Sequence, residues 1–238
     1  MALASHFGPE LFRFLKDLKA NNSRDWFQAN KARYHEELRD PAIRFIADFA
    51  PYLKAISPHF RADPRPVGGS LFRINRDIRF SKDKSPYKTA VGIQFRHDLG
   101  KDAHAPGFYL HLEPGTVFTG MGSWHPDGPT LRSIRERIVD EPEEWRAVRE
   151  AIPGDGDFDS ASPGDPPRLG GDALKRPPRG FDADHPLIED LKRKDFIASM
   201  THDEKSVTAP DFIDRVAESF AAGAPLVAFL CRAVGAPF

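Results

Sequence analysis

The chain has 238 residues, of which 40% are hydrophobic and 29% charged, a composition typical of a water-soluble globular protein with a substantial core. The formal net charge of −1 argues against a nucleic-acid coat protein or a polybasic membrane anchor. The single cysteine, Cys231, excludes an intramolecular disulfide and favours a reducing compartment. The first residues lack a signal-peptide pattern, and the apolar run Leu226 to Cys231 is too short to span a bilayer. We therefore expect a cytoplasmic protein with no membrane partner.

The first third of the chain has helical periodicity. Apolar residues from Leu11 to Leu18 recur at helical spacing, and Asn21 ends that pattern. Ser23 is a good N-cap for a second helix. Pro41 fits the first turn of a third helix, which extends to about Leu53.

The middle of the chain has the alternation typical of strands. We predict strands at Leu71 to Ile74, Thr89 to His97 and Gly107 to Glu113, followed by a turn and a short strand in "PGTVFTG". In the third segment, alternation places Phe108, Leu110 and Leu112 on one face and Tyr109, His111 and Glu113 on the other. Successive strands without helices between them indicate an antiparallel sheet.

The last third returns to helical patterns. Asp127 and Pro142 each fit the start of a helix. Six prolines and six glycines between residues 153 and 180 predict a long loop. Two short helices, Pro210 to Ala221 and Pro225 to Val234, are expected on either side of Gly223. The sequence thus predicts one α+β domain over residues 1–238, a central mainly antiparallel sheet flanked by N-terminal and C-terminal helices.

Known catalytic and cofactor motifs are absent from the sequence. It has no G-x-x-x-x-G-K-[ST] phosphate loop, no G-x-G-x-x-G fingerprint and no G-x-S-x-G elbow. One cysteine cannot supply a thiolate zinc site, and the nine histidines form no H-E-x-x-H pair. The sequence therefore predicts no cofactor and no metal.

The segment from Phe72 to Lys88, "FRINRDIRFSKDKSPYK", has six basic residues and only two acidic ones. Clustered guanidinium and ammonium groups favour an oxyanion ligand, and Tyr87 fits a stacking position beside a base or ring. The expected ligand-binding residues are Arg73, Arg76, Arg79, Lys84, Tyr87 and Lys88. If the segment is extended, Arg76 faces the apolar side, which predicts a buried ion pair with a residue such as Asp25 or Glu113.

Several interpretations of this segment stay open. In the plainest, its Arg–Asp pairs only fix a loop. As a binding module, it would take a phosphate-bearing or other anionic small molecule or a nucleic-acid end. As a hydrolase or transferase, it would use the arginines to stabilise negative charge, with Asp77 or His111 as the base. As a protein-interaction module, it would present the charged loop to a partner. The oligomeric state is not predicted.

Two further features bear on the same question. A second basic stretch lies at residues 174–194. If its loop folds back toward the sheet, it lines one groove together with the segment 72–88. In the alternative interpretation, its lysines are the solvated end of a helix. Trp124 is expected in the core rather than as the wall of a pocket.

The segment 72–88 resembles the signature of an uncharacterised family of conserved hypothetical proteins, domain of unknown function 2461. The resemblance extends to "NNSRDWFQANKARY" near the start, "PGFYLHLEPG" and "GMGSWHPDGPTLRSIRERI" in the middle, and "LKRPPRGFDADHPLIEDLKRKDF" later. It implies a single α+β domain and adds no catalytic residue.

Overall fold

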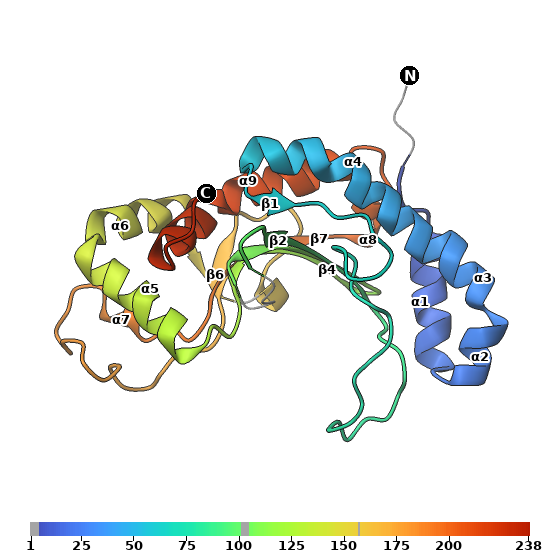
Figure 1. Ribbon diagram of the computed structural model, residues 1–238, viewed down its shortest axis with the longest axis horizontal. Coiled ribbons are helices and arrows are strands. Elements are labelled where there is room, and N and C mark those ends of the chain that lie inside the picture. The colour runs from blue at the N-terminus through green and yellow to red at the C-terminus, as the bar shows by residue number, and fades with distance from the viewer. Residues whose placement is uncertain (1–4, 101–104, 157) are drawn as a thin grey trace.

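The computed structural model of the protein describes residues 5–100, 105–156 and 158–238. A seven-stranded sheet in the order β1-β2-β3-β4-β7-β6-β5 crosses the molecule, and helices cover one face and both ends (Figure 1). The predicted α+β class is confirmed, and among the described strand pairs only β5–β6 is parallel. The strands are β1 (Phe60–Arg61), β2 (Val91–His97), β3 (Gly107–Glu113), β4 (Thr116–Ser123), β5 (Gly154–Asp155), β6 (Arg168–Gly170) and β7 (Phe196–His202).

The amino-terminal helices begin and end where local chemistry predicts. Asn21 caps the end of the first helix, and the Ser23 hydroxyl accepts a hydrogen bond from the backbone N–H of Trp26 at the start of the second. Pro41 lies in the first turn of the long helix α4. The elements are α1 (Glu10–Ala20), α2 (Arg24–Ala29), α3 (Lys31–Arg33), the π-helical segment η1 (Tyr34–Arg39) and α4 (Asp40–Ile56).

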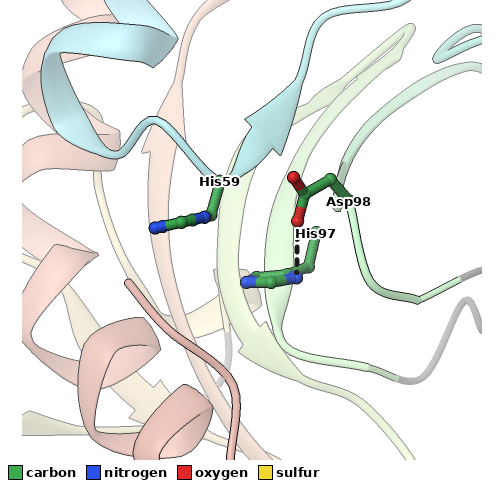
Figure 2. Close-up of side chains that lie close together, drawn as sticks. All are labelled: His59, His97 and Asp98. Carbon is green, nitrogen blue, oxygen red and sulfur yellow. Dashed lines mark ion pairs between the residues drawn. The ribbon is translucent and has the colours of Figure 1, made fainter.

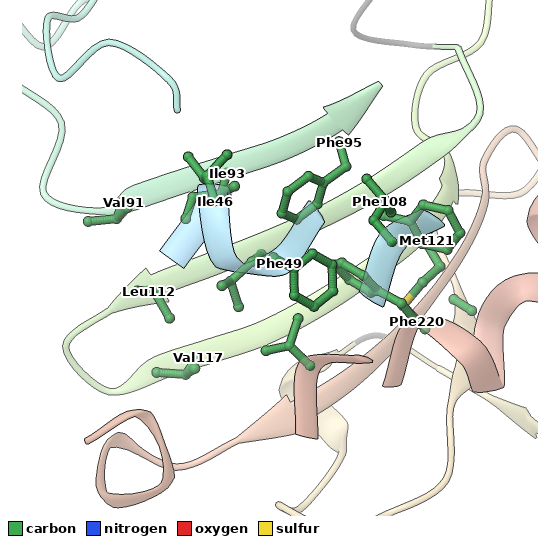
Figure 3. Close-up of a cluster of buried hydrophobic side chains, with 14 of the residues drawn as sticks. Ile46, Phe49, Val91, Ile93, Phe95, Phe108, Leu112, Val117, Met121 and Phe220 are labelled. Atoms are coloured by element: carbon green, nitrogen blue, oxygen red, sulfur yellow. The ribbon is translucent and has the colours of Figure 1, made fainter. Parts of the chain in front are cut away.

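The core lies between the sheet and two long helices, α4 and α9 (Phe212–Ala233). Strand residues at alternate positions turn large apolar side chains toward these helices (Figure 3). Phe49 from α4 lies with its ring centroid 4.9 Å from that of Phe95 in β2, and Phe220 from α9 lies 5.0 Å from Phe108 in β3. The described buried apolar residues form one cluster from the first helix to the last.

The structure corrects the first predicted strand. Leu71 to Ile74 forms no regular strand; Leu71 makes an isolated antiparallel bridge to Ile93, and the chain then leaves the sheet. A second bridge, Asn75 to Tyr87, closes the base of a loop. The other two predicted strands are confirmed as adjacent antiparallel partners, β2 and β3. In the described chain, the segment beyond Ile74 pairs only with its own returning part and not with the sheet, so the expected sorting into two faces fails, and Phe80 is 95% exposed.

The carboxyl-terminal half confirms both predicted helix starts. Asp127 accepts a hydrogen bond from the Thr130 backbone N–H at the start of α5 (Gly128–Asp140), and Pro142 begins α6 (Pro142–Ala151). The next segment differs from the prediction, because the expected loop at 153–180 contributes β5 and β6 to the sheet edge, with β6 paired to β7. The short helices of this half are η2 (Phe158–Ser160), α7 (Ile188–Leu191) and α8 (Glu204–Val207).

The prediction of two carboxyl-terminal helices is wrong, because α9 continues through Pro225 for 22 residues. Gly223 does not divide it; a Cβ there would lie 2.6–2.8 Å from Met121, so glycine lets the helix approach β4 closely. By length and composition α9 is apolar enough to cross a membrane, but 56% of its most apolar window is buried inside the protein. This burial is typical of a core helix.

Candidate functional site

The sheet face opposite α4 and α9 is hollow. On this face Tyr109 of β3 lies opposite Gly120 of β4, and His111 lies opposite Gly92 of β2. Gly92 lines a second cavity, whereas a cavity of about 420 Å³ lies over Gly120. Its lining includes Phe72, Tyr109, His111, Phe118, Gly120, Gly122, Trp124 and Ile197. Most of this lining is apolar or aromatic, as in sites for small organic ligands.

A second cavity of about 520 Å³ lies between this face and the segment 72–88. It shares the wall formed by Phe72, Tyr109 and His111 with the first cavity. The segment itself extends from the sheet on the side away from α4 and α9 (Figure 1). The second cavity differs in charge from the first, because its described lining includes three basic side chains, Lys19, Arg76 and Lys88, against the carboxylate of Asp83.

Three side chains along β3 form a hydrogen-bonded row at the shared wall. The Tyr109 hydroxyl lies 3.1 Å from Nδ1 of His111, and Nε2 of His111 lies 3.4 Å from the Glu113 carboxylate. Glu113 also accepts a 3.2 Å hydrogen bond from the Thr89 hydroxyl. Because a carboxylate only accepts, His111 carries its proton on Nε2, and Nδ1 accepts the tyrosine proton. Strand alternation produces this row, since the three residues are two apart.

Burial controls the titration of this row. It raises the pKa of Tyr109 to about 12, with a further contribution from the charge of Glu113. Burial also lowers the pKa of His111, and the hydrogen bond and charge of Glu113 oppose that shift. Near neutral pH the row is therefore a protonated tyrosine and a neutral imidazole beside a carboxylate. In this arrangement the neutral imidazole can act as a proton acceptor and the tyrosine hydroxyl as a hydrogen-bond donor.

The ammonium group of Lys88 lies in the second cavity, next to the wall that both cavities share. Its Nζ lies 5.1 Å from the ring centroid of Phe72, and among the described residues its ammonium group has no carboxylate partner. Burial, and then the charge of Arg73, lower the pKa of Lys88. Arg96 approaches the same Phe72 ring at 5.8 Å. Two cations therefore flank one aromatic ring at the cavity wall.

The structure brings some of the predicted ligand-binding residues together and separates others. Arg76, Tyr87 and Lys88 line the second cavity, whereas Arg73, Arg79 and Lys84 do not. Arg73 and Arg79 are exposed, and the Lys84 ammonium donates to the Ile78 carbonyl at 3.0 Å. Tyr87 is buried and stacks on Phe27 at 4.1 Å, so its ring belongs to the core side of the cavity wall.

The two predicted catalytic candidates also separate. His111 lies at the wall shared by both cavities. Asp77 lies on the exposed part of the segment, and the guanidinium of Arg79, 2.6 Å away, lowers the pKa of Asp77 to about 2. Asp77 is therefore a charged, paired surface carboxylate near neutral pH, a poor general base.

The predicted burial of Arg76 is wrong. Its side chain is 28% exposed, and its partner is Asp83 of the same loop instead of Asp25 or Glu113. The physical reason is that the segment leaves the sheet after Ile74, so strand alternation no longer sets the direction of Arg76. The pair closes the loop on itself, and Arg76 still reaches the second cavity.

Other predictions concern residues outside the segment. Trp124, expected in the core, is 55% exposed and lines the first cavity, stacked on His125 at 4.3 Å. Among the described lining residues, neither cavity includes a basic residue of 174–194. There Arg193 pairs with Asp190 and Asp155. Tyr109 and the glycines of the cavity floor were missed, although the glycine-rich alternation of "GFYLHLEPGTVFTGMG" is a usable signal.

Fold and site together define an α+β protein whose mainly antiparallel sheet has one helix-covered face and one face with two cavities. The chain belongs to the family described as "Conserved hypothetical protein (DUF2461)", whose family model matches residues 10–229. No curated protein and no solved structure matches the chain. The resemblance predicted from the segment 72–88 and the other motifs is thus confirmed over nearly the whole chain.

Proposed function

We propose that the protein binds a small anionic molecule with an apolar or aromatic body in the two joined cavities. The anionic group, a phosphate or carboxylate, lies in the second cavity beside Lys88 and Arg76. The apolar body lies over the glycines of β3 and β4, between Phe72 and Trp124. Each cavity falls within the range of about 300–1,000 Å³ typical of small-molecule sites.

The observation that carries this proposal is the half-buried ammonium group of Lys88, which has no carboxylate partner among the described residues. Removing a charge from water raises its free energy unless a partner of opposite charge is near. Among the described residues Lys88 has no such partner, and its pKa is lowered by burial and by Arg73. A bound anion would supply the missing partner and would also interact with Arg76 and Lys19, which line the same cavity.

A thermal-shift experiment with matched variants tests the proposal. Phosphate, sulfate, mononucleotides, aromatic carboxylates and short oligonucleotides are compared with chloride at matched low ionic strength. Lys88→Met keeps an apolar stem and removes the cavity charge, and Arg73→Ala/Arg79→Ala removes two charges outside both cavities. A ligand at a hundredfold excess over its Kd adds about 2.7 kcal/mol, or a rise of about 5–10 °C in Tm for a chain of this size.

We expect the wild type and the Arg73→Ala/Arg79→Ala variant to respond alike and Lys88→Met to lose most of the response. A third variant, Gly120→Leu, fills the first cavity; the first added carbon has room, because its nearest neighbour is Ile197 Cδ1 at 3.5 Å. This variant should lose the response to organic anions and keep any response to inorganic phosphate. If no anion acts beyond chloride, or if Lys88→Met responds as the wild type does, the proposal is wrong.

One observation favours a second candidate function, a hydrolase or transferase that works on the same ligand. The row Tyr109–His111–Glu113 places a neutral imidazole between a phenol and a carboxylate at the shared wall. Once the Tyr109 hydroxyl turns from Nδ1 to the substrate, His111 would accept through Nδ1 the proton of the attacking water or hydroxyl group, and Glu113 would stabilise the imidazolium formed. Tyr109, held protonated by its raised pKa, would donate a hydrogen bond to developing negative charge.

Binding and catalysis are separable by experiment. His111→Gln and Tyr109→Phe retain the size of each side chain while removing the proton transfer. If the protein is an enzyme, turnover of a phosphate or carboxylate ester that it binds should fall at least about 100-fold in His111→Gln, with the thermal-shift response retained. Equal turnover by the wild type and by His111→Gln would leave binding as the function.

A further inference from the structure

A cluster of two histidines and one aspartate lies on the other side of the sheet from the cavities. His97 is the last residue of β2, Asp98 follows it, and His59 immediately precedes β1 (Figure 2). The antiparallel register pairs Phe60 with His97, and the Asp98 backbone N–H donates to the His59 carbonyl at 2.8 Å. The backbone ladder therefore holds the three side chains together.

His97 is on the helix-covered face, because it continues the alternation of Ile93 and Phe95 along β2. Its side chain is 4% exposed and packs edge-on against Phe60 at 5.2 Å. The cavity-lining residue Gln94 lies on the opposite face. The cluster is thus separate from the proposed ligand site.

Hydrogen bonding sets the tautomer of His97. Nε2 lies 2.8 Å from the carbonyl oxygen of Pro237, which can only accept, so Nε2 carries the proton. Nδ1 then accepts a hydrogen bond from the Leu99 backbone N–H at 3.1 Å. A carbonyl that orients the distal nitrogen in this way is a regular feature of metal-ligating histidines.

Nδ1 of His97 also lies 3.3 Å from Oδ1 of Asp98, so two acceptor atoms lie close together beside the Leu99 N–H. A cation bound by both atoms would take the place of the Leu99 N–H at Nδ1. Two ligand atoms bound to one tetrahedral Zn²⁺ at about 2.0–2.2 Å are separated by roughly 3.3–3.6 Å. The separation of Nδ1 and Oδ1 therefore already fits a shared metal ion.

His59 supplies the third donor. Its ring stacks on His97 with centroids 5.8 Å apart and planes 10° apart. Each of the three residues offers a ligand atom within 4.8 Å of the others. Coordination requires the half-buried ring of His59 to rotate out of this stacked arrangement, and no hydrogen bond to another described residue holds the ring in place. Arg61, whose Nη2 lies 4.0 Å from the outer oxygen of Asp98, leaves Oδ1 available.

We propose that His59, His97 and Asp98 bind a divalent first-row metal ion, Zn²⁺ in preference, with water in the fourth position. Two imidazoles and one carboxylate are donors that suit Zn²⁺. In the metal-bound protein the ion replaces the Leu99 N–H as the partner of Nδ1. Metal binding joins β1 to β2 and strengthens the His97–Pro237 bond that holds the C-terminus.

Titration of the untagged, chelator-treated protein with Zn²⁺ by calorimetry tests this site, with Co²⁺ absorption as a report of tetrahedral geometry. The wild type should bind one equivalent with a micromolar or lower Kd. His59→Ala and Asp98→Asn should each weaken binding at least tenfold and abolish the Co²⁺ bands. His6→Ala is the matched control, because His6 and Asp48 form a similar pair at 2.9 Å without a third donor in the described residues.

The control variant should bind Zn²⁺ as the wild type does. Circular dichroism of each metal-free variant checks that it is folded before titration, and His97 is left unchanged because it is packed in the core. The absence of stoichiometric binding in the wild type would overturn the proposal. So would an unchanged Kd in both His59→Ala and Asp98→Asn.

Discussion

The two faces of the sheet differ in what the same strands present. Toward α4 and α9, β2 and β3 present Ile93, Phe95 and Leu110, each fully buried. Toward the other side they present Gly92, which lines the second cavity, and Tyr109, which lines both cavities. Strand alternation makes this division possible, since neighbouring residues point to opposite faces. Packing on the covered face stabilises the fold. This stabilisation offsets the free-energy cost of the cavities on the open face.

This difference has a physical cost that is concentrated on the open face. Glycine packs poorly in a strand, and a half-buried lysine without a partner is destabilising. Such departures from stable packing typically mark functional sites. We therefore expect substitutions on the covered face to lower the free energy of unfolding more than those on the open face. On the open face, one substitution should raise it.

The largest expected effect is the loss of a core aromatic ring on the covered face. Phe95→Ala should lower the free energy of unfolding by about 3–5 kcal/mol, because it leaves a cavity between Phe49 and Phe220. Phe72→Ala, the matched substitution on the open face, should cost roughly 1–2 kcal/mol. Urea denaturation measures both. Equal losses would mean that the open face packs as tightly as the covered one.

The next effect is a pH dependence carried by His202 on the covered face. Burial, and then the charge of Arg215, lower the pKa of His202 to about 4. A histidine in the unfolded chain has a pKa near 6.5, so between pH 6.5 and 4 the unfolded state binds more protons than the folded state. The free energy of unfolding therefore falls by roughly 3 kcal/mol as the pH drops from about 6.5 to 4.

Denaturant unfolding at a series of pH values gives this slope. His202→Gln should flatten the curve between pH 6.5 and 4, whatever its effect at neutral pH. The pKa of His111 on the open face is also lowered by burial, but Glu113 opposes the shift, so His111→Gln should flatten the curve less. A larger flattening in His111→Gln than in His202→Gln would contradict the assignment.

A smaller difference in stability is expected between alanine substitutions at two glycines of β4 on the open face. Gly122 has a φ of 129°, and a Cβ there would lie 2.1 Å from the Phe196 carbonyl oxygen. Gly122→Ala should therefore cost about 2–3 kcal/mol through strain and overpacking. Gly120→Ala meets nothing closer than 3.5 Å and should be nearly neutral. Thermal denaturation compares them, and similar midpoints would show that close backbone approach does not constrain Gly122.

The smallest effect has the opposite sign. Lys88→Met on the open face should raise the free energy of unfolding by about 0.5–1 kcal/mol without ligand, since solvent screens a half-buried charge only in part. Urea denaturation in chloride buffer measures the change. Arg79→Ala is the control on the exposed part of the segment and should not stabilise, because it removes the partner of Asp77. A destabilised Lys88→Met variant would indicate that the ammonium group has a stabilising role in the folded protein.

Local sequence determined the elements whose signals lie within a few residues. Alternation fixed β2 and β3, including which face carries Tyr109 and His111. Caps such as Ser23 and Asp127 fixed where helices begin. These predictions held because each depends on hydrogen bonds or side-chain spacing along one stretch of chain.

Tertiary structure decided the features that depend on distant partners. Pro225 did not end α9, because packing against the sheet outweighs a local helix-breaking signal. Leu71 to Ile74 failed as a strand because only Leu71 and Phe72 find partners on β2. The cavity wall needs Trp124, Phe72 and His111 from three separate segments. A local sequence pattern cannot predict that these three side chains lie close together, because their proximity depends on the register and twist of the whole sheet.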